Sequence, residues 1–384
     1  MLRLLTIVGA RPQIIKAAAL SRAIRNHYPS QIEECILHTG QHYDADMSAV
    51  FFDELGIPQP TYNLHVGSGT HAQQTARMLE GIEQVLLSAE QPFDGIIIYG
   101  DTNSTVAGAL AGSKLHIPIF HVEAGLRSYN MAMPEELNRI VADQLSSILF
   151  APTQTAVDNL AKEGFLSSLA KFADGRLRKV ILTGDIMFDN SVYYSQIAET
   201  KSHILQELSL TKKRFALATI HRPANTDNPT NLAQIFEALL AIAETEQLPI
   251  VLPVHPRTRA LLPKQLTLGL LERIQKSAYL RIVSPASFYE MILLEKYAAV
   301  VFTDSGGVQK EAFFFNTPCV ILRPETEWVE ILKTGAGIIA DASYERILEA
   351  YQQLKETQVE FPQLFGDAHA AEYILQQIIN YMTA

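Results

Sequence analysis

Short β-branched runs alternate with longer amphipathic stretches along the whole 384-residue chain. Segments with a helical period separate the runs, for example 13–27, 71–89, 103–115, 229–243 and 307–315. Continuous apolar strands joined by helices are typical of parallel sheets that are covered on both faces. The pattern predicts an α/β protein with twelve strands, at 3–8, 33–38, 95–99, 117–121, 148–150, 180–182, 215–219, 249–253, 280–283, 298–302, 318–322 and 337–340.

The strands fall into two sets of six, and the chain is too long for one ordinary hydrophobic core. We therefore expect two doubly wound, Rossmann-like domains. The turn in "LTGDIMFDN" favours a boundary that gives domains of residues 1–183 and 184–366, with a terminal amphipathic helix at 367–384. In such a protein, ligands are expected in a cleft between the two domains, at the carboxyl ends of the strands.

The composition limits the possible partners. Hydrophobic residues make up 48% and charged residues 19%, which is typical of a globular enzyme, and the net charge of −10 argues against a nucleic-acid or membrane partner. The start does not resemble a signal peptide, and no apolar run reaches the ~18–20 residues of a membrane span. We expect a soluble, cytoplasmic protein whose two cysteines are buried and reduced.

Polar residues follow the predicted strands of the first half. Gly9 and Arg11 open a helix after the first strand, which suits an anion but also fits an ordinary turn with a surface arginine. This element is neither a dinucleotide fingerprint nor a P-loop. Asp101 follows a later strand, and a helix N-cap is the commoner role for such an aspartate.

The stretch "HVEAGLRSYNMAMPEELNR" carries more charge than packing requires. Glu135 and Glu136 fall in the first turn of a helix, where the helix dipole favours carboxylates, and Glu136 is expected to stay solvated. That explanation does not cover Glu123, which directly follows a strand.

In the second half, His221 and Arg222 follow one strand and His255 follows the next. In "FTDSGGVQKEA", a strand ends at Asp304, and Gly306 and Gly307 then open a helix whose N–H groups suit a diphosphate. Glu311 lies one turn further and can chelate a sugar diol. No His and Cys cluster has zinc spacing, and Ser305 has no evident histidine partner for acyl transfer.

Seven motifs in this order resemble the bacterial non-hydrolysing UDP-N-acetylglucosamine 2-epimerases: "GARPQIIK", "HTGQHYD", "YGDTNST", "HVEAGLRS", "MPEELNR", "IHRPANT" and "DSGGVQKEA". The resemblance implies the GT-B fold, with the C-terminal helix packing back on the first domain. "QHYDADMSAVFFDELGIPQPTYNL", "VGSGTHAQQT" and "ETEWVE" are most similar to the branch that epimerises UDP-2,3-diacetamido-2,3-dideoxy-glucuronic acid.

The C–H bond at C2 of a nucleotide sugar is not acidic, so a base alone cannot invert it. The resemblance implies that UDP leaves in an anti elimination to a glycal and then adds again, which requires carboxylates at the ring and cations at the diphosphate. No NAD and no metal is implied. The family match gives the catalytic residues as Asp101, Glu123, Glu135 and His221. It gives the substrate-binding residues as Arg11, Lys16, Arg127, Arg222, His255, Phe288, Ser305, Gly306, Gly307 and Glu311.

Some relatives bind a second substrate molecule as an activator, and Gln41 and His42 match that region while Tyr43 and Asp44 depart from it. "HPRTR" also departs from the family pattern at His255. A homodimer that serves cell-surface polysaccharide synthesis is the family expectation. The alternatives are a GT-B glycosyltransferase, a hydrolysing 2-epimerase and a non-catalytic nucleotide-sugar sensor.

Overall fold

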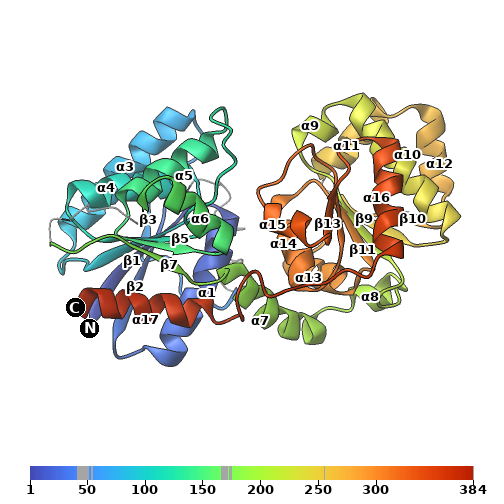
Figure 1. The fold of residues 1–384 in the computed structure, drawn as a ribbon. Coiled ribbons are helices and arrows are strands. Elements are labelled where there is room, and N and C mark those ends of the chain that lie inside the picture. The colour runs from blue at the N-terminus through green and yellow to red at the C-terminus, as the bar shows by residue number, and fades with distance from the viewer. Residues whose placement is uncertain (41–51, 53–54, 166–171, 173–174, 255, 384) are drawn as a thin grey trace. The chain divides into compact units, whose positions relative to one another are not determined.

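The computed structural model describes residues 1–384 except 41–51, 53–54, 166–171, 173–174, 255 and 384. The chain forms two compact units, one of residues 1–190 together with 363–384 and the other of residues 191–362. Each unit is a parallel sheet between layers of helices (Figure 1), so the chain has the predicted α/β class. None of the described helices combines the length and the apolar composition that a membrane span requires.

The sheet of the first unit has the strand order β3-β2-β1-β4-β5-β6-β7, and every pairing is parallel. The order reverses direction at β1 and β4, so the chain winds first one way and then the other. Its strands are β1 (Leu2–Val8), β2 (Ile32–His38), β3 (Tyr62–Asn63), β4 (Gly95–Tyr99), β5 (Ile119–Val122), β6 (Ile148–Ala151) and β7 (Lys179–Leu182).

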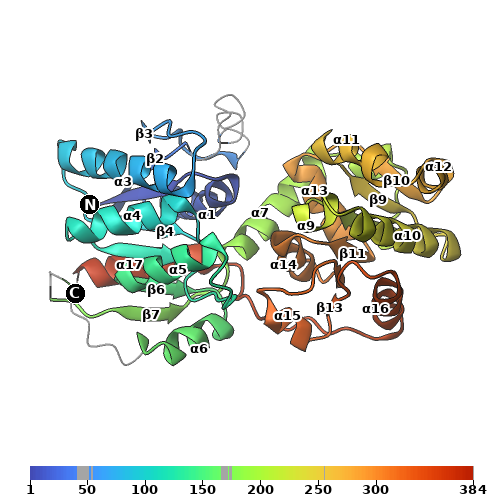
Figure 2. The ribbon, with the colours of Figure 1, turned by 90° about the horizontal axis from the view of Figure 1, so that it is seen from above.

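Helices cover both faces of this sheet. One face carries α3, α4, α5 and α6, and the other carries α1 and α17 (Figure 2). Their bounds are α1 (Arg11–His27), α3 (His71–Ser88), α4 (Asn103–Lys114), α5 (Pro134–Leu145), α6 (Gln154–Lys162) and α17 (Ala370–Thr383). The strands between these layers are almost wholly apolar; β4, for example, is buried along its full length.

The second unit repeats the design with the strand order β10-β9-β8-β11-β12-β13. Its strands are β8 (Ala216–Thr219), β9 (Ile250–Pro253), β10 (Leu280–Val283), β11 (Val300–Thr303), β12 (Cys319–Ile321) and β13 (Gly337–Ile339). Its helices are α8 (Ile204–Glu207), α9 (Pro223–Thr226), α10 (Pro229–Thr245), α11 (Pro256–Gln265), α12 (Leu268–Lys276), α13 (Phe288–Tyr297), α14 (Gly306–Phe314), α15 (Val329–Lys333) and α16 (Tyr344–Glu356). The helix α7 (Ile186–Lys201) runs across the division between the units.

All twelve predicted strands are present, each within two residues of its expected ends. The strand β3 was not predicted, because two residues carry no periodicity that a sequence pattern can reveal. Both cysteines are buried and free, as expected.

The division between the units lies at residues 190 and 191, whereas the sequence favoured 183 and 184. The reason is that the first turn of α7 is bonded to the first unit. The Asn190 amide donates to the backbone carbonyl of Ile15 in α1 at 2.6 Å. The Asp189 carboxylate accepts the first two N–H groups of α17, from Ala370 at 3.2 Å and Ala371 at 2.7 Å. These contacts hold the C-terminal helix to the first unit beside α1.

Asp189 gives a testable pH dependence of stability. Burial raises its pKa to about 7, with smaller contributions from the charges of Glu372 and Asp185, although the bonds from the two N–H groups of α17 act in the opposite direction. The folded chain therefore holds this proton between about pH 4 and pH 7, where the unfolded chain has released it, so stability falls as the pH rises through this window. We expect Asp189→Asn to remove this part of the pH dependence, which changes the free energy of unfolding by on the order of a few kcal/mol across the window.

The measurement is urea unfolding of the wild type and of Asp189→Asn at pH 5 and at pH 8. The wild type should lose more stability than the variant between the two pH values. Equal losses would show that Asp189 does not titrate in this window.

Candidate active site

Two carboxylates lie at the carboxyl ends of neighbouring strands in the first unit. Tyr99 at the end of β4 pairs in register with Val122 at the end of β5. Glu123 follows Val122 directly, and Asp101 follows Tyr99 after the single residue Gly100. This is the edge of a parallel sheet at which ligands bind in doubly wound folds.

Glu123 has a φ of 69°, in the left-handed region that costs an ordinary residue about 1–2 kcal/mol. Its carboxylate forms an ion pair with the Lys16 ammonium of α1, and the two side chains are 9% and 12% exposed. A Cβ added to Gly100 would lie 3.2 Å from Lys16 Nζ and 3.4 Å from Glu123 Oε2, so the chain passes close beside this pair. The unusual backbone angle turns the Glu123 side chain from the end of the strand toward Lys16.

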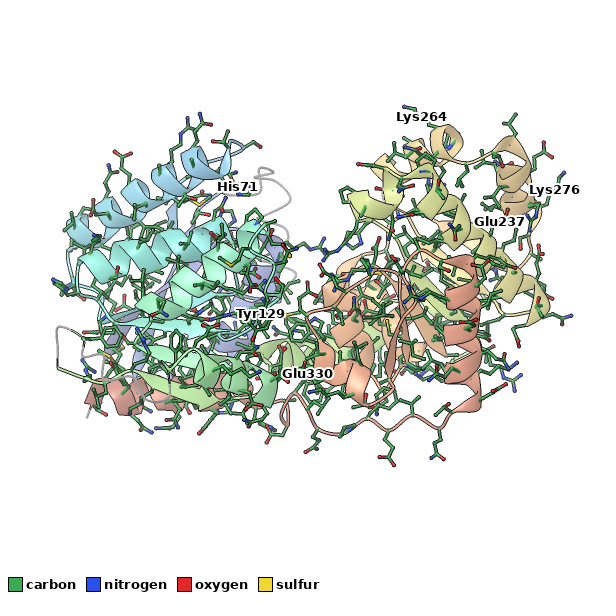
Figure 3. The ribbon with its side chains drawn as sticks, turned by 45° about the horizontal axis from the view of Figure 1, so that its top comes forward. His71, Tyr129, Glu237, Lys264, Lys276 and Glu330 are labelled. Atoms are coloured by element: carbon green, nitrogen blue, oxygen red, sulfur yellow. The ribbon has the colours of Figure 1, made fainter. Side chains whose placement is uncertain are left out.

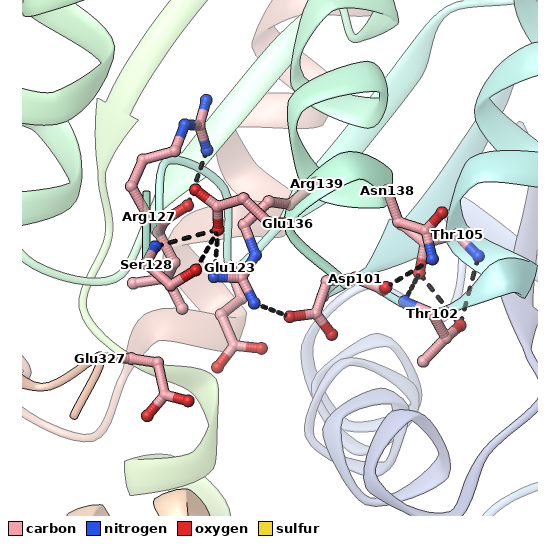
Figure 4. Close-up of polar contacts among 12 residues, drawn as sticks. Asp101, Thr102, Thr105, Glu123, Arg127, Ser128, Glu136, Asn138, Arg139 and Glu327 are labelled. Atoms are coloured by element: carbon pink, nitrogen blue, oxygen red, sulfur yellow. Dashed lines mark hydrogen bonds and ion pairs between the residues drawn. The ribbon is translucent and has the colours of Figure 1, made fainter. Parts of the chain in front are cut away.

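Asp101 forms an ion pair with Arg139 of α5, and Figure 4 shows it beside Glu123. Burial raises the pKa of Asp101, with a further contribution from the Glu123 charge, although Arg139 and Lys16 act in the opposite direction. The N-cap role that the sequence favoured for Asp101 belongs to Thr102, whose hydroxyl accepts the N–H of Thr105. Asp101 is therefore not needed to cap α4, and its carboxyl faces the charged groups around Glu123.

The two glutamates at the start of α5 differ in their surroundings. Both lie in the first turn, as predicted, and Glu135 is exposed. The expectation of a solvated Glu136 is wrong, because this residue is only 1% exposed. Its carboxylate accepts the backbone N–H groups of Ser128 and Tyr129, both at 2.9 Å, and forms an ion pair with Arg139 at 3.1 Å. Glu136 thus holds the loop that carries the exposed Tyr129 (Figure 3).

This difference makes the two neighbours a matched pair. We expect Glu136→Ala to destabilise the protein by about 3–5 kcal/mol, since it leaves the buried Arg139 charge short of a partner and removes the acceptor of two backbone N–H groups. We expect Glu135→Ala to change stability by less than about 0.5 kcal/mol, as is usual for an exposed position. Chemical denaturation of both variants tests this, and equal losses would contradict the assigned burial.

The predicted contact of Arg127 with substrate is at odds with the structure. Its side chain is 1% exposed and forms ion pairs with Asp143 at 2.7 Å and with Glu163 at 2.7 Å. Asp143 also contacts the buried His121 at 2.7 Å. Although burial opposes it, the bond from His121 and the charge of Arg127 hold the pKa of Asp143 below its usual value. Arg127 therefore belongs to a buried ionic network behind the two carboxylates.

In the second unit, His221 lies two residues after the end of β8. It is oriented by Asp304, which directly follows β11. Its Nδ1 lies 2.9 Å from Asp304, which is fully buried, while the imidazole is 55% exposed. Asp304 also accepts the backbone N–H groups of His221 and Arg222 and the side-chain amide of Asn225. Against the effect of burial, these donors hold the pKa of Asp304 below its usual value. The exposed edge of the His221 ring is thereby left available to a ligand.

The helix α14 begins where the sequence predicted a diphosphate site. Ser305 is its N-cap and accepts the N–H of Val308, and Gly306 and Gly307 form its first two positions. The Trp328 indole donates to the Gly306 carbonyl at 3.0 Å. Glu327 lies beside Gly306, where Arg323 balances its charge through an ion pair of 2.5 Å. This helix end can therefore present its free N–H groups to an anion.

The remaining predicted residues take up varied positions. Arg11 is the first residue of α1 and is exposed, and Arg222 is the N-cap of α9. Glu311 lies in α14 and is partly buried. Phe288 packs edge-to-face against Tyr194, with ring centroids 5.2 Å apart. Gln41, His42 and His255 lie outside the described residues.

Sequence reasoning missed the residues that orient the predicted ones. Arg139, Asp143 and Asp304 each fix a candidate side chain. Arg139 and Asp304 lie within the motifs "MPEELNR" and "DSGGVQKEA" but received no role from them, and Asp143 lies outside the motifs. A buried charge must have a partner, so a carboxylate within an apolar segment, such as Asp143 in α5, was the available signal.

Comparisons with known proteins give the family of the chain. The family model of UDP-N-acetylglucosamine 2-epimerase matches residues 23–379. The chain is 46% identical over 378 residues to the UDP-2,3-diacetamido-2,3-dideoxy-D-glucuronate 2-epimerase of Pseudomonas aeruginosa, covering 98% of this chain and 99% of the relative. It is also 46% identical over 380 residues to a UDP-N-acetylglucosamine 2-epimerase homolog of Methanococcus maripaludis, covering 99% and 100%.

Among solved structures, the UDP-GlcNAc 2-epimerase of Methanocaldococcus jannaschii, in complex with UDP-GlcNAc and UDP, superposes with a TM-score of 0.82. The two sequences are 37% identical, and the match covers 99% of this chain and 100% of that one. The two doubly wound units thus form a fold of the GT-B type, and the chain belongs to the UDP-N-acetylglucosamine 2-epimerase family of isomerases.

Proposed function

We propose that this chain inverts C2 of a UDP-N-acetylhexosamine, in the manner of UDP-GlcNAc to UDP-ManNAc, and keeps the nucleotide. The observation that carries the proposal is that two carboxylates, at the ends of neighbouring strands, are each paired with a cation from a helix. Glu123 is paired with Lys16, and Asp101 is paired with Arg139. A site that both removes and returns a proton requires carboxyl groups in different protonation states.

The surroundings of the two carboxyls support different roles. The Glu123 carboxylate is paired with the Lys16 ammonium, which suits a base. The raised pKa of Asp101 suits a group that carries a proton. Glu135, exposed at the start of α5, is the third carboxylate that the family resemblance assigns to catalysis.

The reaction proceeds in two balanced halves. The bond between C1 and the UDP oxygen breaks and its electron pair leaves with UDP, while a carboxylate takes the proton from C2. The product is a glycal with a double bond between C1 and C2. Protonation of C2 from the opposite face and return of the UDP oxygen to C1 give the epimer. No electrons are exchanged with a cofactor, so the scheme requires no NAD, and we propose that donors of the protein stabilise the diphosphate without a metal.

UDP has to remain bound between the two halves. His221, oriented by Asp304, supplies a donor for the diphosphate, and the N–H groups at the start of α14 supply further ones. Glu311 in α14 is assigned to the ribose hydroxyls, and Arg11 at the start of α1 to phosphate charge. Phe288 is assigned to the uracil.

The same chemistry on UDP-2,3-diacetamido-2,3-dideoxy-glucuronic acid is the second candidate. It is favoured by the 46% identity with a relative of that name over 98% of this chain. The two substrates share the acetamido group at C2 and differ at C3 and C6. Their relative kcat/KM decides between them.

The decisive experiment incubates the protein with each UDP-sugar in D2O without an acceptor. We expect deuterium at C2 of both epimers, while the total UDP-sugar concentration stays constant. Stoichiometric release of free sugar and UDP would identify a hydrolysing epimerase. Absence of exchange with both substrates would contradict the proposal and favour a transferase or a sensor.

We further propose a cytoplasmic homodimer that supplies precursors for cell-surface polysaccharide. The family resemblance supports the dimer, and the nucleotide-sugar substrate class supports the pathway. Light scattering at several protein concentrations tests the dimer, which a constant monomer mass would contradict.

A further inference from the structure

A buried histidine lies directly behind the candidate carboxylates. His121 in β5 is fully buried, and both of its ring nitrogens have partners. Nε2 lies 2.8 Å from the Gly100 carbonyl oxygen, and Nδ1 lies 2.7 Å from Asp143 Oδ1. Because a carbonyl oxygen can only accept, Nε2 must carry a hydrogen.

The second nitrogen also faces an acceptor. Asp143 Oδ2 accepts the Gly125 N–H at 3.2 Å and forms an ion pair with Arg127 at 2.7 Å. Two further donors therefore hold in place the carboxylate that contacts Nδ1. His121 is thus bonded in two directions, to a backbone carbonyl at one strand end and to a carboxylate of α5.

These bonds join three segments that carry the candidate catalytic groups. The Gly100 carbonyl belongs to the peptide bond that leads into Asp101. Gly125, two residues after Glu123, is tied to Asp143, and Asp143 lies on α5 together with Arg139. The Gly100 N–H also donates to the Val122 carbonyl at 3.0 Å, next to Glu123.

The backbone at both junctions is unusual. Gly100 and Gly125 have φ values of 61° and 80°, and Glu123 between them has 69°. A Cβ on Gly125 would lie 2.6 Å from the Ala156 carbonyl oxygen, so this turn is packed tightly against α6. A strained turn persists only where its surroundings hold it, and the His121–Asp143 pair supplies bonds on both sides of Glu123.

We propose that His121, through Asp143, is a positioning residue that sets the placement of Glu123 relative to Asp101 for proton transfer at C2. This inference rests on the proposed function. His121 is buried behind the strand ends and acts through the backbone at residues 100 and 125. Its loss should therefore lower kcat and leave nucleotide binding unchanged.

Two substitutions each keep one of the two bonds. His121→Gln places an amide near the position of Nε2, and His121→Asn places one near Nδ1. We expect both to lower kcat by about 10- to 100-fold, the effect of a displacement near 1 Å at a reacting group. The KM and the Kd for UDP should stay within about threefold of wild type, because uniform binding is unaffected. Deuterium exchange at C2 should fall in step with kcat.

Leu149→Ala is the matched structural control. Leu149 pairs with His121 in the register of β5 and β6 and is fully buried, but its side chain makes no polar contact. It should lower the melting temperature and keep kcat close to wild type. If Leu149→Ala reduces kcat as much as the His121 variants, or if folded His121 variants keep wild-type kcat, the proposal is overturned.

Where the single variants fail to fold, the double variant His121→Gln/Asp143→Asn, which replaces both members of the pair by neutral side chains, takes their place and should show the same loss of kcat. A readout independent of turnover is the downfield ring N–H resonance of His121, which should be present in wild type and lost in His121→Gln. Its absence in wild type would overturn the positioning pair. Lack of C2 exchange in wild type, with this resonance present, would instead refute the proposed function alone.

Discussion

Glu123→Gln should strongly slow epimerisation while leaving UDP affinity unchanged. The substitution keeps the size and hydrogen-bonding shape of the side chain beside Lys16 but removes its capacity to take a proton. Positioned acid–base groups contribute about 10²- to 10⁴-fold, so we expect kcat to fall by about that factor. A coupled assay or proton NMR of the epimers gives kcat, and calorimetry with UDP gives the affinity.

Glu80→Gln is the control, since it makes the same chemical change at an exposed position of α3. It should behave as wild type in both measurements. Retention of kcat within about threefold in Glu123→Gln would remove this residue from the proton-transfer scheme. Parallel loss of UDP binding would point to a misfolded site instead of a missing base.

Asp304→Asn should weaken UDP binding by about 10- to 100-fold. The wild-type carboxylate accepts the backbone N–H groups of His221 and Arg222 and orients the His221 ring. An amide in its place turns an NH2 group toward one set of these donors, and hydrogen bonds to a charged group contribute about 1.5–3 kcal/mol. The loss of His221 orientation should therefore appear mainly as a higher Kd for UDP and a higher KM.

Asp227→Asn is the matched control in the same unit, because Asp227 is exposed at the end of α9. It should leave the Kd for UDP unchanged. If Asp304→Asn binds UDP as tightly as wild type and is folded, His221 does not depend on this carboxylate for its orientation.

The strands and the strand-end positions of the candidate residues could be predicted from sequence, because buried parallel strands are continuous apolar runs. Which side chains of α5 are buried and which are exposed could not be predicted. Glu135 and Glu136 satisfy the helix dipole equally well, and only the packing of the loop at Ser128 and Tyr129 decides which of them is buried.

The residues that bond to the candidate residues could not be predicted, because they lie far from them along the chain. Asp143 lies 22 positions from His121, and Asp304 lies 83 positions from His221. The left-handed backbone of Glu123 was hidden for another reason: non-glycine residues rarely adopt it, so local sequence gives no warning. This backbone conformation of Glu123 depends on hydrogen bonds and ion pairs with residues that are distant along the chain.

The return of α17 to the first unit bears on how this protein is made. Tyr381 of α17 packs edge-to-face on Phe120 in β5, and its backbone carbonyl accepts from Arg176. A ribosome completes residues 1–190 and then the entire second unit before it delivers this helix. Until then, one apolar face of the nascent first unit has only α1 as its cover, so the second unit is free to fold earlier. We therefore expect the first unit to complete its fold after the second, and the nascent first unit to be most exposed to chaperones and to aggregation in that interval.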